Sequence, residues 1–166
     1  ALRSIQQQAD TIRSTLLDAL SDADEHIRVK ILEWIDWNHL PTKQRAEPIL
    51  IQLAANDASP AVRAQATRIL GTLKRPDLVA LFQQNLNDSS YQVCAEALRA
   101  GYLISPKEYT QIALQEFPNA RGGMQRQCLE IFIAQKDSQG LNLIKTKIPR
   151  LFNRHRAELV QFFSRL

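Results

Sequence analysis

The sequence predicts an all-α protein built as a solenoid of about five antiparallel helix pairs. One pattern occurs at residues 57–71 and returns at residues 88–101: an aspartate, a valine five positions later, then small and large apolar residues. Its two aspartates, Asp57 and Asp88, are 31 residues apart, a spacing typical of helical-repeat proteins. Only 5 of the 166 residues are glycine, which favours helix, and no stretch shows the two-residue alternation of a strand.

Composition indicates one globular domain of ordinary character. Hydrophobic residues make up 45% of the chain and charged residues 23%. No apolar run approaches the roughly 18–20 residues that span a bilayer, so no membrane span is expected. The chain begins at Ala1 within a helical pattern and without an initiator methionine. We therefore expect it to be the C-terminal part of a larger protein.

The first two expected helices cover residues 2–20 and about 24–38. Apolar residues at three- and four-residue steps define the first, and the acidic stretch that follows it can end it and cap the next. The second helix aligns with the repeated pattern at an offset of 35 residues. That alignment gives Ile27 the place of Val62 and Trp34 the place of Ile69, so both are expected in the core.

Prolines and turn residues divide the rest of the chain. The further helices are expected at residues 43–56, 60–73, 76–87, 90–104, 106–117, 123–136, 138–148 and 150–165. Pro48 lies inside the first of these, which either starts at Pro48 or is kinked there. Pairing the helices gives repeats at approximately residues 1–40, 41–74, 75–105, 106–137 and 138–166. The last copy has His155 where a valine is expected, as suits the terminal cap of a solenoid.

Within each repeat the second helix carries the apolar stripe. Val62 and its counterparts Val93 and Met124 are expected to be buried, and the small residues Ala66 and Ala97 should let neighbouring helices approach closely. Asp57 is placed to cap the helix that follows it.

The pattern Asp-x-x-x-x-Val-Arg-x-x-Ala-x-x-x-Leu at residues 57–70 resembles HEAT repeats in their short bacterial form. The Thr-Pro-Leu-His start of ankyrin repeats and the Trp, Leu-Gly and Tyr spacing of tetratricopeptide repeats are absent. The resemblance implies a right-handed α-α superhelix of the HEAT and armadillo kind.

Residues 88–100, Asp-Ser-Ser-Tyr-Gln-Val-Cys-Ala-Glu-Ala-Leu-Arg-Ala, are similar to a segment of the C-terminal helical domain of gluzincin zinc aminopeptidases, the group of aminopeptidase N and leukotriene A4 hydrolase. The resemblance covers roughly residues 22–135. It implies a non-catalytic domain that packs on the catalytic domain of the same polypeptide and shapes substrate access. The sequence has no His-Glu-x-x-His motif, so no catalytic residue, metal ligand or cofactor is predicted in this chain. Zinc is expected in the catalytic domain of the parent protein.

Two groups of cations are candidate binding residues. Arg68, Arg99 and Arg126 recur on the non-core side of successive second helices, where a solenoid has its concave face, and are suited to a peptide carboxylate or an acidic partner. The second group is a possible basic docking patch in the last third of the chain, which carries ten Lys and Arg against five Asp and Glu. Its residues are Lys145, Lys147, Arg150, Arg154 and Arg156. A solvated basic surface is the alternative for both groups.

Two other features have a structural and a functional interpretation. Trp34, Asp36 and Trp37 lie together as in HEAT-like DNA glycosylases, which grip nucleic acid with Trp, Asp and Arg, but core packing of Trp34 is favoured. Cys94 and Cys128 fall on apolar helix faces and are expected to be buried, inert thiols.

Three hypotheses for the function follow. The first is the helical domain of a zinc aminopeptidase, and the second is a free-standing HEAT scaffold that binds a protein or peptide. The third, disfavoured by the modest charge, is a nucleic-acid binder.

Overall fold

A computed structural model of the chain describes residues 2–37 and 40–147. Over these residues the fold consists of nine α-helices and two 3-10 helices, without a strand. The helices are α1 (Leu2–Asp18), η1 (Ala19–Ser21), α2 (Glu25–Trp34), α3 (Leu40–Asn56), α4 (Pro60–Thr72), η2 (Pro76–Leu78), α5 (Val79–Asn85), α6 (Tyr91–Tyr102), α7 (Pro106–Glu116), α8 (Gly122–Ala134) and α9 (Ser138–Lys147). The predicted all-α helical-repeat superhelix is confirmed.

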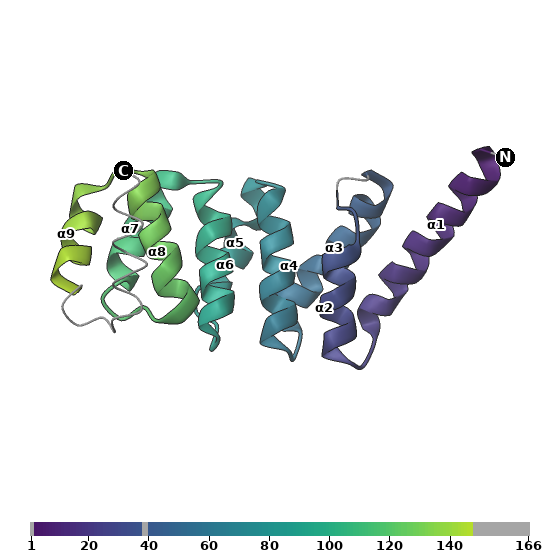
Figure 1. Ribbon diagram of the computed structural model, residues 1–166, viewed down its shortest axis with the longest axis horizontal. Helices are drawn as coiled ribbons and strands as arrows, with labels where there is room; N and C mark the ends of the chain where they lie inside the picture. The colour runs from purple at the N-terminus through teal and green to yellow at the C-terminus, as the bar shows by residue number, and fades with distance from the viewer. Residues whose placement is uncertain (1, 38–39, 148–166) are drawn as a thin grey trace.

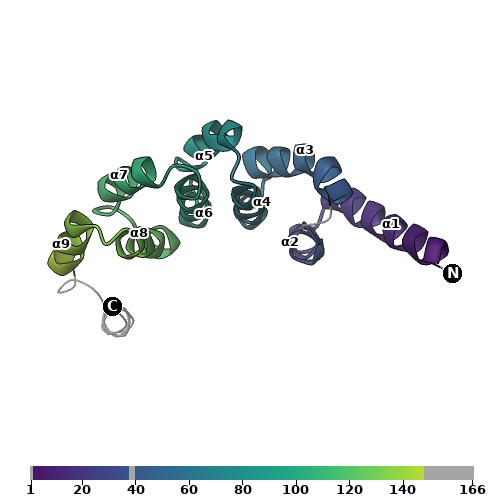
Figure 2. The ribbon, with the colours of Figure 1, turned by 90° about the horizontal axis from the view of Figure 1, so that it is seen from above.

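The helices stand in two rows that follow one curve. Figure 1 shows α2, α4, α6 and α8 standing one after another along the long axis of the molecule. Seen from above in Figure 2, α3, α5 and α7 form an outer row, and α2, α4, α6 and α8 form an inner row on the concave side. Helix α1 continues from the end of the outer row and extends away from α2 (Figure 2). Its main neighbours are η1 and α3.

The inner helices bury the stripe that the repeat pattern predicts. Val62 and Val93 are fully buried and Met124 is nearly so. Ala66 and Ala97 are fully buried as well, and the helices that carry them, α4 and α6, pack directly against each other. The apolar side chains form two clusters, one centred on α2 to α5 and the other on α6 to α9.

Two residues of the first repeat contradict the expected register. Ile27 is 43% exposed and Trp34 is 70% exposed, although their counterparts Val62 and Ile69 are buried. The physical reason is the position of α2 at the end of the inner row. Helix α4 has an inner-row neighbour on each side, α2 and α6, whereas α2 packs against α4 and η1. The neighbouring Ile31 and Leu32 are buried, so α2 still contributes to the core.

Two helix boundaries also differ from the expectation. The second helix ends at Trp34 instead of about residue 38, because Ile35 adopts extended backbone angles of φ −65° and ψ 131°. The third helix begins at Leu40 and runs through Pro48, so a start at Pro48 is wrong. Pro48 has no N–H, and the helix therefore lacks one of its internal hydrogen bonds at this turn.

At two contacts between one repeat and the next, a glycine on one helix lies opposite an aromatic ring on the other. A Cβ atom added at Gly101 on α6 would overlap the ring of Tyr109 on α7. One repeat later the roles are exchanged, because a Cβ added at Gly140 on α9 would overlap the ring of Phe132 on α8. Tyr109 and Phe132 are fully buried. Each glycine therefore makes room for the aromatic ring opposite it.

Candidate functional site

A cleft on the inner row brings together side chains from three successive repeats. It encloses about 370 Å³ between α2, α4 and α6 and is open to solvent. All three helices belong to the concave side of the solenoid (Figure 2). Its lining combines cationic, amide, hydroxyl, carboxylate and apolar side chains: Leu32, Glu33, Trp37, Gln65, Arg68, Ile69, Thr72 and Arg99.

Trp37 forms an apolar wall at one end of the cleft. It follows the C-terminus of α2, where its indole Nε1–H donates to the backbone carbonyl of Leu32 at 2.9 Å. The indole is half-buried and packs against the core of the first cluster. This hydrogen bond and the packing hold the ring in place and leave part of it facing solvent.

Arg68 and Arg99 bring two guanidinium groups to the same cleft. Arg99 is 31% exposed, and its Nε–H donates to Glu96 at 2.9 Å, so part of its charge is already compensated. A second donor of Arg99 lies 3.4 Å from the backbone carbonyl of Arg68, which ties α6 to α4. Arg68 itself is exposed, and within the described part of the chain it has no ion pair. Arg68 is therefore the cation of the cleft whose guanidinium is available to bind a carboxylate of a ligand.

The remaining predicted site residues do not join this cleft. Arg126 is exposed on α8, one repeat beyond Arg99, and is absent from the cleft lining. Of the basic docking patch, the structure describes Lys145, which is exposed on α9, and only the backbone of Lys147. The other three patch residues, Arg150, Arg154 and Arg156, lie outside the described residues, as does the expected last helix. Binding by either group therefore stays a prediction.

The aromatic and acidic cluster at the end of α2 differs from the expectation. Trp34 is exposed, so its predicted burial in the core is wrong, and it does not line the cleft. Trp37 is the aromatic residue that does. The inner row carries both positive and negative side chains: Lys30 pairs with Glu33, and Arg99 pairs with Glu96. Such a surface does not have the concentrated positive charge that binds a phosphate backbone.

The candidate groups for metal binding and nucleophilic chemistry are the His, Cys, Asp and Glu side chains. No cluster of three His, Cys, Asp or Glu residues that could hold a metal ion occurs in residues 2–37 and 40–147. Cys94 and Cys128 are both buried, as predicted, and burial raises the pKa of the Cys94 thiol. A raised thiol pKa disfavours the nucleophilic thiolate. None of the described helices is both long and apolar enough to cross a membrane.

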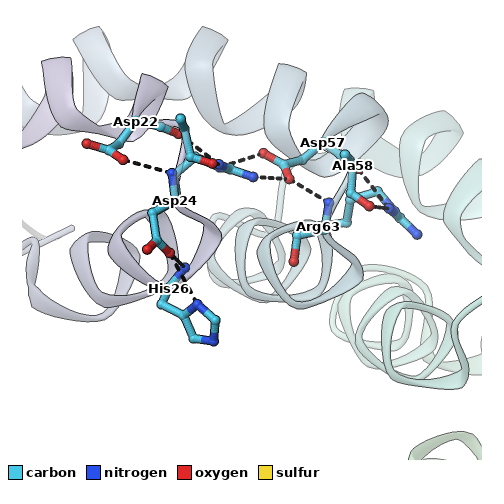
Figure 3. Close-up of polar contacts among 9 residues, drawn as sticks. Asp22, Asp24, His26, Asp57, Ala58 and Arg63 are labelled. Atoms are coloured by element: carbon cyan, nitrogen blue, oxygen red, sulfur yellow. Dashed lines mark hydrogen bonds and ion pairs between the residues drawn. The ribbon is translucent and has the colours of Figure 1, made fainter.

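The predictions from the sequence missed a ladder of ion pairs that links the repeats; Figure 3 shows its first step, at Asp57. The guanidinium of Arg28 donates to both carboxylate oxygens of Asp57, at 2.9 and 2.7 Å, and to the carbonyl of Asp22 at 2.7 Å. One repeat later, Arg63 donates to both oxygens of Asp88, at 2.7 and 2.8 Å, and to the carbonyl of Asp57 at 2.7 Å. Each arginine thus joins its own repeat to the next.

The ladder also corrects the predicted role of Asp57. The N-cap of α4 is Ser59, whose side chain makes no capping hydrogen bond. The Asp57 carboxylate accepts the backbone N–H of Ser59 at 2.8 Å and the two donors of Arg28. One sequence signal could have revealed the ladder: Arg28 and Arg63 occupy the same position in their repeats, and the following repeat of each begins its pattern with an aspartate.

The fold defines a helical-repeat protein with a cleft on its concave side. Comparison with known families agrees with this class. Residues 47–112, which cover most of the second repeat, all of the third and the start of the fourth, match the family described as HEAT repeats. The match supports a HEAT-repeat domain, and domains of this kind suggest a scaffolding or protein-binding role. No curated protein matches the chain.

Proposed function

We propose that this chain is a non-catalytic scaffold that binds an acidic segment of a partner protein in the cleft between α2, α4 and α6. The observation that carries the proposal is the exposed guanidinium of Arg68 beside the half-buried indole of Trp37 and the partly compensated Arg99. A carboxylate suits the guanidinium because the two form charge-assisted, bidentate hydrogen bonds. The indole offers an adjoining apolar contact, and aromatic and arginine residues dominate the energetics of protein interfaces.

The shape of the cleft favours an extended segment over a compact ligand. Its residues come from three successive repeats, so a segment that runs across the repeats can contact all of them. Gln65 and Thr72 supply an amide and a hydroxyl that can bond the backbone of a bound chain. Glu33 at the same cleft, whose charge Lys30 compensates in part, disfavours a second carboxylate near it and limits how many acidic residues a good ligand carries.

A random peptide display library selected against the whole chain tests the proposal. We expect enriched peptides to contain an acidic residue next to an apolar one, and we expect enrichment to be lost with Arg68→Ala. Arg121→Ala is the matched control, because Arg121 is exposed at the start of α8 and does not line the cleft. Enrichment that survives Arg68→Ala, or peptides without carboxylates, would contradict the proposed site.

The second candidate function is the helical domain of a zinc aminopeptidase. The segment that begins at Asp88-Ser-Ser-Tyr91 and its likeness to that group favour it. On this hypothesis the chain packs on the catalytic domain, which holds the zinc, and the basic residues from Lys145 onward contact that domain. Reading the open reading frame before Ala1 is the direct test. A frame without His-Glu-x-x-His would refute the aminopeptidase hypothesis and leave the scaffold proposal intact.

A further inference from the structure

Helix α2 exposes two large apolar side chains on one side of the helix. Ile27 and Trp34 lie seven residues apart, two turns of helix, and are 43% and 70% exposed. In the three following inner helices the corresponding positions are buried: Val62 and Ile69, Val93 and Ala100, and Met124 and Ile131. The first inner helix therefore exposes side chains of the kind that its successors bury against a neighbour. An exposed tryptophan and isoleucine on one stripe indicate an interaction surface.

The ion-pair ladder has an unfilled position at the same end. Asp22, Asp57 and Asp88 make the same local hydrogen bond, each accepting the backbone N–H two residues later at 2.8 Å. Asp57 and Asp88 also receive two guanidinium donors from the preceding repeat. Within the described residues Asp22 receives none, and its carboxylate points away from Asp57 in Figure 3. Asp22 thus has the local geometry of a ladder aspartate without its arginine.

We propose that this end of the inner row is a docking surface for one further helical hairpin, whose second helix carries an arginine in the position of Arg28 and Arg63. Charge complementarity defines the occupant, because a guanidinium at that position would meet the Asp22 carboxylate as Arg28 meets Asp57. The same helix would cover Ile27 and Trp34 and remove their apolar surface from water.

The inner helices α6 and α8 of a second copy fit this surface less well. At the ladder position they carry Cys94 and Gln125 in place of arginine, and the copy expected after them, which lies outside the described residues, carries Arg156. Cys94 keeps only the contact within its own repeat, with its Sγ 3.2 Å from the carbonyl of Asp88. The described helices α6 and α8 therefore offer no ladder arginine to the Asp22 of another copy.

The test adds one hairpin to the intact chain. A copy of residues 40–74, which carries its own ladder arginine, is fused before Ala1. Acrylamide quenching then reports the exposure of Trp34, whose contribution is isolated by comparison with Trp34→Phe. We expect the quenching of Trp34 to fall several-fold in the fusion and the urea midpoint to rise.

Asp22→Asn is the matched variant, because asparagine keeps the oxygen that accepts the N–H of Asp24 and loses only the charge. We expect it to cancel most of the gain in the fusion and to change the unfused chain little. Unchanged quenching of Trp34 in the fusion, or an equal effect of Asp22→Asn on both chains, would overturn the proposal. Protection of Trp34 by self-association of the unfused chain, measured by sedimentation, would also overturn it, since a second copy would then be the occupant.

Discussion

Gly101→Ala should destabilise the protein because the added methyl has no space. The new Cβ would lie 2.5 Å from Cδ1 of Tyr109 and closer still to two other atoms of that ring. Tyr109 is fully buried between α6 and its neighbours, so the ring cannot swing into solvent. Inserting a methyl into such a core costs about 1–3 kcal/mol and sometimes more. Replacing a helical glycine by alanine ordinarily stabilises by about 1 kcal/mol, which offsets part of that cost. Because the new methyl would overlap three atoms of the ring, we take the upper end of that range, about 3 kcal/mol, and expect a net loss of about 2 kcal/mol.

Urea unfolding followed by circular dichroism measures this loss as a change in the free energy of unfolding. Gly123→Ala is the control in the same fold, because its Cβ would lie an ordinary 3.4 Å from the nearest atom, Cβ of Ala95. It should stabilise by about 0.5–1 kcal/mol. Adding Tyr109→Leu to Gly101→Ala should make the double variant at least about 1 kcal/mol more stable than additivity predicts.

A Gly101→Ala protein as stable as the parent would refute the reasoning. Strict additivity of the two substitutions would refute it as well, since residues that compete for one volume must be coupled.

Three further predictions concern the core, the ladder and the buried phenol. Val62→Asp buries a charge between repeats and should lower the free energy of unfolding by several kcal/mol. The melting temperature measured by circular dichroism should fall strongly, and an unchanged melting temperature would contradict the assigned register. Arg63→Met should lower the free energy of unfolding by about 2–3 kcal/mol at pH 7, because it removes the cation that pairs with the Asp88 carboxylate. The hydrogen bonds from Arg63 lower the pKa of Asp88, so this contribution exists above the unfolded value of about 3.9 and is lost as the pH falls through the lowered pKa. The stability difference between parent and variant should therefore shrink below about pH 4, and a constant difference from pH 7 to pH 3 would argue against it. Burial raises the pKa of Tyr109 to about 12, so the parent should lose stability as the pH rises from about 10 to 12, while Tyr109→Phe should not. At pH 7 the same variant should be neutral or slightly stabilising, because the buried Tyr109 hydroxyl has no hydrogen-bond partner among the described residues.

The repeat pattern predicted what depends on spacing within the chain. It placed Val62, Val93 and Met124 at equivalent buried positions because each belongs to a helix that packs against the inner helix of the preceding repeat. It failed at Ile27 and Trp34 because a periodic pattern shows which face of a helix is apolar and does not show whether another helix covers that face.

The candidate cleft was predictable in part for the same reason. Arg68 and Arg99 are 31 residues apart, so their meeting on the inner row follows from the repeat. Trp37 was not predictable as a cleft residue. It lies in the irregular segment after α2, where the repeat pattern does not determine the backbone conformation on which its hydrogen bond to Leu32 depends. The ion-pair ladder was predictable in part. Its arginines and aspartates recur at regular positions, but the spacing alone does not show that each arginine pairs with the aspartate of the next repeat.

The exchange of glycine and aromatic residue between Gly101–Tyr109 and Phe132–Gly140 makes the hairpins non-interchangeable. If α7 and α8 were excised, Gly101 would face Gly140, and the space that an aromatic ring fills would be empty. If the α7–α8 hairpin were duplicated in tandem, Phe132 of the first copy and Tyr109 of the second would compete for room that holds a single ring. Removing or duplicating this hairpin would thus require a compensating substitution at the new junction, although the hairpins share one backbone plan.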